Sequence, residues 1–202
     1  MFPCVKSTHM KAVFNMSDYF NIGHTTIKGL TILQRKALYD KRGYLERFFC
    51  QQELGMILKG REIVQVNHTL TSTKGAVRGM HFQHQPNAEM KFVSCIRGKV
   101  FDVAVDLRKN SSTFLQYHSE VLTAKNHKTF VIPEGFAHGF QALTTDCEML
   151  YFHTANYNKD SEGLINAIDP RLNIKWPKTV VDRSERDKNH PMVTDKFDGI
   201  SI

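Results

Sequence analysis

The chain has 202 residues, of which 27 are Lys or Arg and 20 are Asp or Glu, and its formal net charge is +7. With 41% hydrophobic residues it is too apolar to be disordered throughout, yet charged residues interrupt every apolar run before the about 20 residues of a membrane-spanning helix, which excludes an integral membrane protein. The basic residues are spread along the chain without a nucleic-acid-binding motif, so a small phosphorylated ligand explains the charge better than nucleic acid.

The first part of the chain, residues 1–27, fits no strand pattern and lacks the apolar core and cleavage site of a secretory signal. We therefore expect an N-terminal extension over 1–27, a single domain over 28–202, and a cytoplasmic protein. The cysteines form no closely spaced pair, which favours reduced thiols over a zinc or redox site. They are Cys4, Cys50, Cys95 and Cys147.

From residue 29 onward the pattern is typical of short strands. Within residues 91–108, apolar and polar residues alternate on both sides of Arg97-Gly98, which predicts a hairpin of half-buried strands. One short amphipathic helix is expected over 48–58, and Ser184 is a candidate cap for a helical turn over 181–187. Strands so closely spaced favour an all-β barrel or sandwich. The remaining strands are expected over 29–40, 113–122, 129–133 and 147–154.

Two histidines stand in spacings typical of a cupin. Gly75 precedes His81 by six positions, and 133-PEGFAH-138 places His138 after a tight turn. Together these half-motifs predict a cupin-like double-stranded β-helix, or jelly roll, with few short helices. Gln83 stands where a metal cupin needs a second histidine, and two imidazoles are fewer than the three ligands usual in a catalytic metal site. We expect no metal here, and histidines that bind substrate or transfer protons.

Several linked stretches in matching order resemble the dTDP-4-dehydrorhamnose 3,5-epimerase family, over roughly residues 29–192. The resemblance implies that the chain inverts C3, C5 or both in a nucleotide-linked 4-keto-6-deoxyhexose, without a cofactor. Which of these carbons it inverts stays open. The stretches are 77-VRGMHFQ-83, 91-KFVSCIRGKVFDVAVDLRKNSSTF-114, 132-IPEGFAHGFQAL-143, 149-MLYFHTANY-157, 161-SEG-163, 176-WP-177 and 184-SERD-187.

Such a reaction needs three groups, because a ketone at C4 acidifies the protons at C3 and C5 and each inversion passes through an enolate. By resemblance, His81 is the base, and Asp187 is the carboxylate that fixes its tautomer and stabilises the imidazolium. Tyr151 is the acid that returns a proton from the opposite face. Lys91 is our choice for the donor to the enolate oxygen, with help from His138.

The resemblance also implies a set of substrate-binding residues. Near the nucleotide the chain departs from the family: the acid expected after 40-DKRG-43 falls one place early as Glu46, and Arg47 takes its position. Because strand faces alternate, this shift turns one side chain away, so a dTDP-linked sugar is expected while CDP- and GDP-linked sugars stay open. The other expected binding residues are Arg78, Tyr157, Arg42, Gln65 and Asn67.

The family is dimeric, so we expect a homodimer in which the region of Arg42 completes the partner's site. Two other functions compete with the epimerase. A cupin 3,4-ketoisomerase would act on the same substrates but give a different product, and a non-catalytic carbohydrate-binding barrel would bind sugar without turnover.

Overall fold

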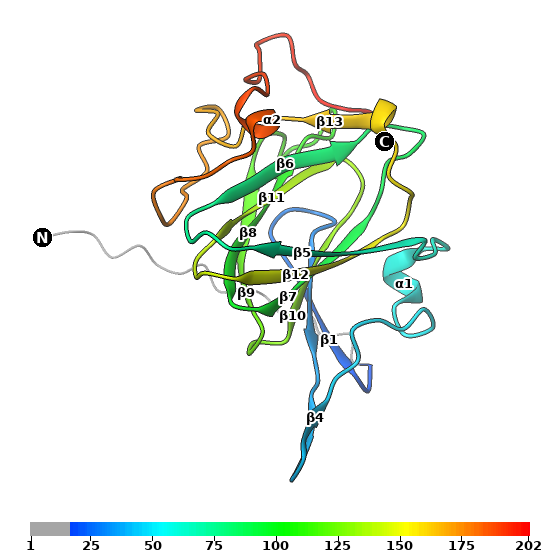
Figure 1. Ribbon diagram of the computed structural model, residues 1–202. Coiled ribbons are helices and arrows are strands. Elements are labelled where there is room, and N and C mark those ends of the chain that lie inside the picture. Colours follow the sequence, from blue (N-terminus) through cyan, green and yellow to red (C-terminus); the bar gives the residue numbers. More distant parts are fainter. Residues whose placement is uncertain (1–16) are drawn as a thin grey trace, which may run out of the picture.

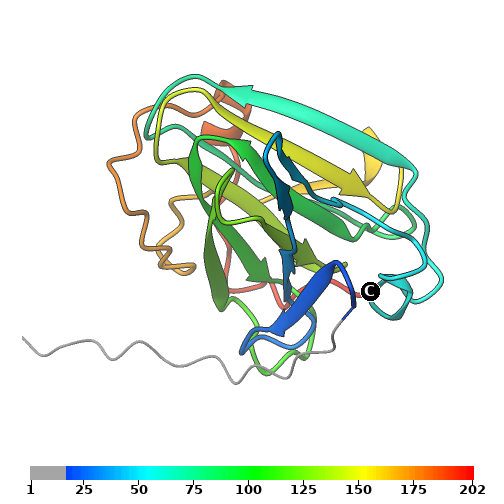
Figure 2. The ribbon, with the colours of Figure 1, turned by 90° about the horizontal axis from the view of Figure 1, so that it is seen from below.

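The structure, a computed structural model, describes residues 17–202. Two antiparallel β-sheets pack face to face as a sandwich, which confirms the predicted all-β jelly roll (Figures 1 and 2). The six-stranded sheet contains, in spatial order, β1 (Phe20–His24), β2 (Thr31–Arg35), β10 (Lys128–Ile132), β7 (Lys91–Arg97), β12 (Cys147–His153) and β5 (Gln65–Thr71). The five-stranded sheet contains β13 (Glu162–Leu164), β6 (Val77–Gln83), β11 (Phe136–Ala142), β8 (Lys99–Asp106) and β9 (Tyr117–Thr123).

The other elements are short. Strands β3 (Leu38–Asp40) and β4 (Gly43–Leu45) form a hairpin that extends away from the two sheets (Figure 1). The helices are α1 (Gly55–Leu58), the 3-10 turn η1 (Lys159–Ser161) and α2 (Glu185–Lys188). Within residues 17–202, none of them has the length and hydrophobicity to cross a membrane.

Two elements differ from the expectation near the start of the chain. A strand before residue 29 was not predicted, yet β1 pairs with β2 from Phe20 to His24. Only the last four residues of the helix expected over 48–58 are helical, because the preceding part packs as a loop: the Phe49 ring lies against Phe92 and Phe152 of the six-stranded sheet. The part of the expected extension before residue 17 lies outside the described residues.

The predicted hairpin over residues 91–108 is wrong. Both strands exist, but β7 belongs to the six-stranded sheet and β8 to the five-stranded sheet, so the chain turns a corner at Gly98 instead of folding back on itself. Alternating patterns cannot distinguish the two cases, because each strand keeps one face toward the sandwich interior in either arrangement. This corner brings Lys91 and Asp102 to the same interior from opposite sheets.

Strand β8 is also buried on both faces, whereas the alternation predicted one solvated face. Its residues Val100 and Ala104 belong to the core between the sheets, and Val103 and Val105 belong to a second core outside the five-stranded sheet. That second core is closed by the C-terminal segment, including Ile165, Ala167, Leu172 and Ile200. The C-terminal segment therefore covers the sheet that carries His81 and brings α2 against β6.

Strand β6 contains a bulge that decides which way its side chains face. Three residue steps separate Arg78 from His81 in β6, whereas only two separate their partners in β11, Phe140 and His138. In a regular strand Arg78 and His81 would face opposite sides, but the extra residue turns both into one cavity. Gly79, at the bulge, has φ of 117°, and a Cβ there would lie 2.6 Å from the Gly139 Cα and 2.7 Å from the His138 carbonyl oxygen. Only glycine fits this position.

We expect Gly79→Ala to lower the free energy of unfolding by about 3 kcal/mol, from backbone strain together with overpacking against β11. Chemical denaturation measures this change. Gly55→Ala is the matched control: no atom lies within 4 Å of an added Cβ in α1, so this variant should be as stable as the parent chain or slightly more stable. Equal stability of both variants would contradict the assigned role of the bulge.

Candidate active site

A cavity of about 700 Å³ lies at the end of the sandwich where β5, β6, β7, β11 and β12 meet the segment that leads into α2. Most of the residues that line it have polar or charged side chains, which suits a hydrated, charged ligand. Seven of the residues expected from the sequence lie in its wall, from both sheets and from α2. They are His81, Asp187, Tyr151, Arg78, Lys91, His138 and Asn67.

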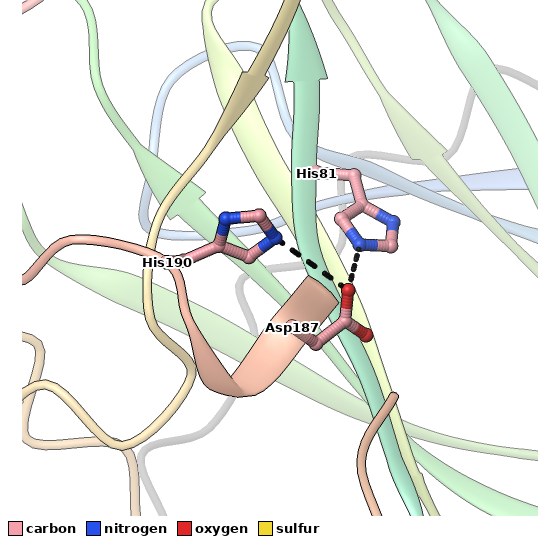
Figure 3. A group of neighbouring side chains, drawn as sticks. All are labelled: His81, Asp187 and His190. Carbon is pink, nitrogen blue, oxygen red and sulfur yellow. Dashed lines mark hydrogen bonds and ion pairs between the residues drawn. The ribbon is translucent and has the colours of Figure 1, made fainter. Parts of the chain in front are cut away.

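The expected histidine–carboxylate pair is present. His81 Nε2 lies 2.9 Å from Asp187 Oδ1 (Figure 3). The Gly79 N–H donates to Asp187 Oδ2 at 3.2 Å. Ser184 caps α2, as predicted, by accepting the Asp187 N–H at 3.0 Å. Asp187 is thus held through its backbone and through both carboxylate oxygens, and it keeps the imidazole in one orientation.

Electrostatics favour an ionised carboxylate in this pair. Burial by itself would raise the pKa of Asp187, but the hydrogen bond and charge of His81 and the Gly79 N–H outweigh it and lower the pKa to about 2. A carboxylate accepts from Nε2–H, so the lone pair of the imidazole lies on Nδ1. His81 can therefore take a proton at Nδ1 while Asp187 stabilises the positive charge that results.

Tyr151 stands on β12 of the six-stranded sheet, across the sandwich from His81 on β6 of the five-stranded sheet. Its ring lies edge-on to His138, with centroids 6.1 Å apart, and is stacked on His153 at the same distance. Burial raises the pKa of the Tyr151 phenol, which therefore stays protonated at neutral pH. The cavity thus has a base on one wall and a proton donor on the opposite wall.

His138 is paired with a carboxyl group that the sequence analysis did not single out. Its Nε2 lies 2.8 Å from Oδ1 of Asp102, which is completely buried on β8. Burial raises the pKa of Asp102, and the hydrogen bond and charge of His138 oppose that rise. The sequence offers one indication that Asp102 is buried: in the alternating pattern of this strand, Asp102 shares a face with the core residue Ala104.

Lys91 is likewise held by a group that was missed. Its ammonium lies 3.0 Å from Oε1 of Glu89, whose other oxygen lies 2.7 Å from His153 Nδ1. His153 Nε2 in turn lies 3.3 Å from the Asn67 side-chain nitrogen. All three ionisable side chains are buried, with 8 to 10% of each exposed. Burial would raise the pKa of Glu89, but His153 and Lys91 outweigh it and lower that pKa.

This chain of contacts fixes the direction of the Lys91 ammonium. The sequence spacing hints at this arrangement. Glu89 stands two residues before Lys91, and His153 stands two residues after Tyr151. Two residues is the interval between neighbours on one face of a strand. Nothing in the sequence alone indicates that these two positions touch.

A second hollow of about 310 Å³ adjoins the main cavity and shares His81, Lys91, His153 and Asn67 with it. Here lie Gln65 and Tyr157, two further residues expected to bind substrate. The Tyr157 N–H donates to Gln65 Oε1 at 2.9 Å, while the Tyr157 side chain is largely exposed. The two hollows together form a continuous site long enough for a ligand with a sugar and a second polar part.

Three expected binding residues lie outside the cavity of this chain. Arg42 is at the tip of the β3–β4 hairpin, where its exposed side chain pairs with Asp40. Glu46 Oε2 lies 2.9 Å from Nε of the buried Arg35 and 2.8 Å from Nδ1 of His127. The Arg47 guanidinium stacks on Tyr19, 3.8 Å from the ring centroid, and pairs with Glu53. None of the three reaches the His81 cavity within one chain.

Comparison with known proteins agrees with this geometry. A family model described as dTDP-4-dehydrorhamnose 3,5-epimerase matches residues 24–195. The dTDP-4-dehydrorhamnose 3,5-epimerase of Salmonella typhimurium is 44% identical over 155 residues, which cover 76% of this chain and 84% of that protein. The enzyme of Escherichia coli K12 with the same name is 40% identical over 161 residues, covering 79% and 86% of the two chains.

Solved structures show the same similarity. The Legionella pneumophila epimerase, solved in complex with dTDP-4-keto-L-rhamnose, has a TM-score of 0.82 and 37% identity, covering 86% of this chain and 93% of that one. The dTDP-4-dehydrorhamnose 3,5-epimerase of Elizabethkingia anophelis has a TM-score of 0.83 and 35% identity, covering 89% and 99%. Fold, sequence and family model agree, and the chain belongs to the dTDP-4-dehydrorhamnose 3,5-epimerase family.

Proposed function

We propose that this chain epimerises C3 and C5 of a dTDP-linked 4-keto-6-deoxyhexose. The observation that carries the proposal is the arrangement of the cavity: a carboxylate-paired imidazole on one sheet faces a protonated phenol on the other. A sugar ring held between them presents one face to His81 and the other to Tyr151. Removal of a proton on one face and delivery on the other is what inversion of a carbon requires.

In the first step, Nδ1 of His81 takes the proton from the carbon beside the ketone, and the bonding electrons move onto the ketone oxygen. Asp187 stabilises the imidazolium that forms. The Lys91 ammonium, directed by Glu89, donates to the developing enolate oxygen, where a donor placed in advance lowers the barrier. His138 lies at the same wall and is oriented by Asp102.

In the second step, the Tyr151 phenol gives its proton to the opposite face of the same carbon. The phenolate then regains a proton from solvent, and the imidazolium releases the one it took. The atoms balance without an external reagent, since one proton leaves the sugar and one returns.

The nucleotide is proposed to be dTDP. The Legionella pneumophila relative is solved with a dTDP sugar, and a relative from Bacillus anthracis is solved with TDP and PPi bound. Gln65, Asn67 and Tyr157 in the second hollow, together with Arg78, supply polar and cationic groups for the nucleotide side of such a ligand. A nucleoside diphosphate does not cross a membrane unaided, so we place the activity in the cytoplasm.

Nuclear magnetic resonance in D2O tests the function directly. With the dTDP-linked 4-keto-6-deoxyglucose as substrate, we expect solvent deuterium at C3 and C5 and an inverted product, and weaker or no reaction with the CDP and GDP analogues. His81→Asn should lower the rate by about 10²- to 10⁴-fold, since it removes the base. His24→Asn, at an exposed position on β1, is the matched control and should react normally.

Failure of all three nucleotide sugars to exchange would contradict the epimerase. A carbonyl moved from C4 to C3 would indicate the ketoisomerase, and ligand binding that survives His81→Asn without any turnover in the parent chain would indicate a binding barrel.

Tyr151→Phe separates the two proton transfers. His81 can still remove a proton and return one to the same face, so deuterium exchange should continue, while formation of the inverted product falls by at least about 100-fold. The ratio of exchange to inversion, measured in one NMR time course, is the readout. Tyr117→Phe, on β9 outside the cavity, should leave this ratio unchanged. Equal loss of exchange and inversion in Tyr151→Phe would argue against its role as the opposite acid.

We also propose a homodimer formed through the β3–β4 hairpin. Four of its apolar side chains are 50 to 70% exposed, which is unusual for a cluster on a monomer surface: Leu38, Tyr39, Tyr44 and Leu45. Strand β5 ends the six-stranded sheet with its edge open and with exposed Val66 and Leu70. A hairpin from a second chain against such an edge would bring Arg42 to the partner's cavity.

Sedimentation velocity checks the dimer. Leu45→Glu should convert the dimer to monomer, because a buried, unpaired charge in the interface is costly, and should reduce activity together with it. Met56→Glu places the same charge on α1, where Met56 is 77% exposed, and should leave the dimer intact. A parent chain that sediments as a monomer would overturn this proposal without affecting the chemistry.

A further inference from the structure

A third ionisable side chain lies beside the His81–Asp187 pair and has no part in the mechanism above. His190 follows α2, and its Nε2 lies 3.6 Å from Asp187 Oδ1, the same oxygen that His81 approaches at 2.9 Å. Figure 3 shows the two rings directed at this carboxylate from different parts of the chain. The His190 side chain is only 9% exposed, and among residues 17–202 its Nε2 finds no hydrogen-bond partner. A buried polar atom left without a partner requires an explanation.

The distances among these groups fit a metal ion. The two imidazole nitrogens and the carboxylate oxygen all lie within 4.8 Å of one another. Around a tetrahedral Zn²⁺ with bonds of about 2.0–2.1 Å, neighbouring ligand atoms are about 3.3 Å apart, close to the two measured separations from Asp187. Asp187 is also held from behind, since Gly79 donates to its other oxygen, and such support is typical of a metal-ligating carboxylate.

We propose that His81, Asp187 and His190 form a binding site for a zinc-like divalent cation, and that the bound cation inhibits the enzyme. The donor set of two imidazoles and one carboxylate suits Zn²⁺ or Co²⁺ and is poor for Mg²⁺ or Ca²⁺, which prefer oxygen ligands throughout. His81 and Asp187 line the cavity, so water there can supply a fourth ligand. The cation has no part in the epimerisation.

Inhibition follows because a neutral imidazole cannot bind the cation and accept a proton from the sugar at the same time. A neutral imidazole has one nitrogen lone pair, which in the active pair lies on Nδ1. When His81 gives a lone pair to the cation from Nε2, the ring hydrogen moves to Nδ1, and no lone pair remains to accept a proton from the sugar. Asp187 is occupied by the same ion, so the stabilisation of the imidazolium is lost as well.

Two neighbouring guanidinium groups oppose the cation: Arg183 lies 3.5 Å from the Asp187 carbonyl oxygen, and Arg186 lies beside His81. Arg186 Nη2 lies 3.4 Å from His81 Nε2, and the same guanidinium pairs with Glu162 at 3.1 Å. Its side chain is 51% exposed, so it can turn away, but its charge near the site must weaken binding. Removal of this charge is therefore expected to strengthen binding of the cation, a change that loss of a structural contact would not produce.

The test is a titration of the metal-free protein with Zn²⁺ by calorimetry and with Co²⁺ by visible absorption, which reports tetrahedral coordination. The parent chain should bind one ion per chain with a tetrahedral Co²⁺ spectrum. His190→Gln should raise the Kd at least about tenfold, and Arg186→Gln should lower it. His24→Gln, an exposed histidine on β1, is the matched control and should bind as the parent chain does.

In parallel, Zn²⁺ should slow turnover of the parent chain and lose this effect in His190→Gln, with each variant compared with its own metal-free rate. Unchanged affinity in both His190→Gln and Arg186→Gln, or an octahedral Co²⁺ spectrum, would overturn the proposal and place the ion elsewhere, for example on the free thiols. The binding measurements need no substrate, so they stand or fall independently of the proposed epimerase activity.

Discussion

The site depends on one irregularity in the backbone, the bulge of β6 at Gly79. A regular strand separates residues at odd spacing onto opposite faces, so Arg78 and His81 could not share a cavity without the extra residue. The close approach of Gly79 to Gly139 on β11 makes the bulge possible, and the Gly79 N–H also donates to the carboxylate of Asp187. One glycine therefore positions the proposed base and helps to hold the carboxylate paired with it.

Three buried carboxylates of the site each orient a cationic or proton-accepting side chain. Asp187 holds His81, Asp102 holds His138, and Glu89 lies between Lys91 and His153. Each carboxylate offsets part of the cost of burying a cationic or proton-accepting side chain, and each fixes where that side chain points. The cavity is thereby polar but ordered, which is the condition for stabilising an enolate without a large rearrangement of the surroundings.

The sequence predicts the groups that react better than the groups that hold them. His81, Asp187, Tyr151, Lys91 and His138 stand in linked motifs, and the structure places all five around one cavity. Asp102 and Glu89 were missed because their significance comes from contacts with neighbouring strands that are distant in the sequence: Asp102 on β8 contacts His138 on β11, and Glu89, just before β7, contacts His153 on β12. For the same reason the hairpin expected around Gly98 was wrong, since alternation describes the faces of a strand and not its neighbours. Arg42 and Glu46 stand in a motif, yet in this chain they contact groups outside the cavity: Arg42 contacts Asp40, and Glu46 contacts Arg35 and His127. A motif does not show which surface its residues face.

Asp187 belongs to the segment that covers the outer face of the five-stranded sheet, and it follows the last strand, β13, by more than twenty residues. During synthesis, both sheets therefore emerge from the ribosome before the carboxylate that pairs with His81. A chain that stops early has an uncovered sheet and an imidazole without its partner. The C-terminal segment therefore completes the His81–Asp187 pair and covers the second core at the same late stage of synthesis.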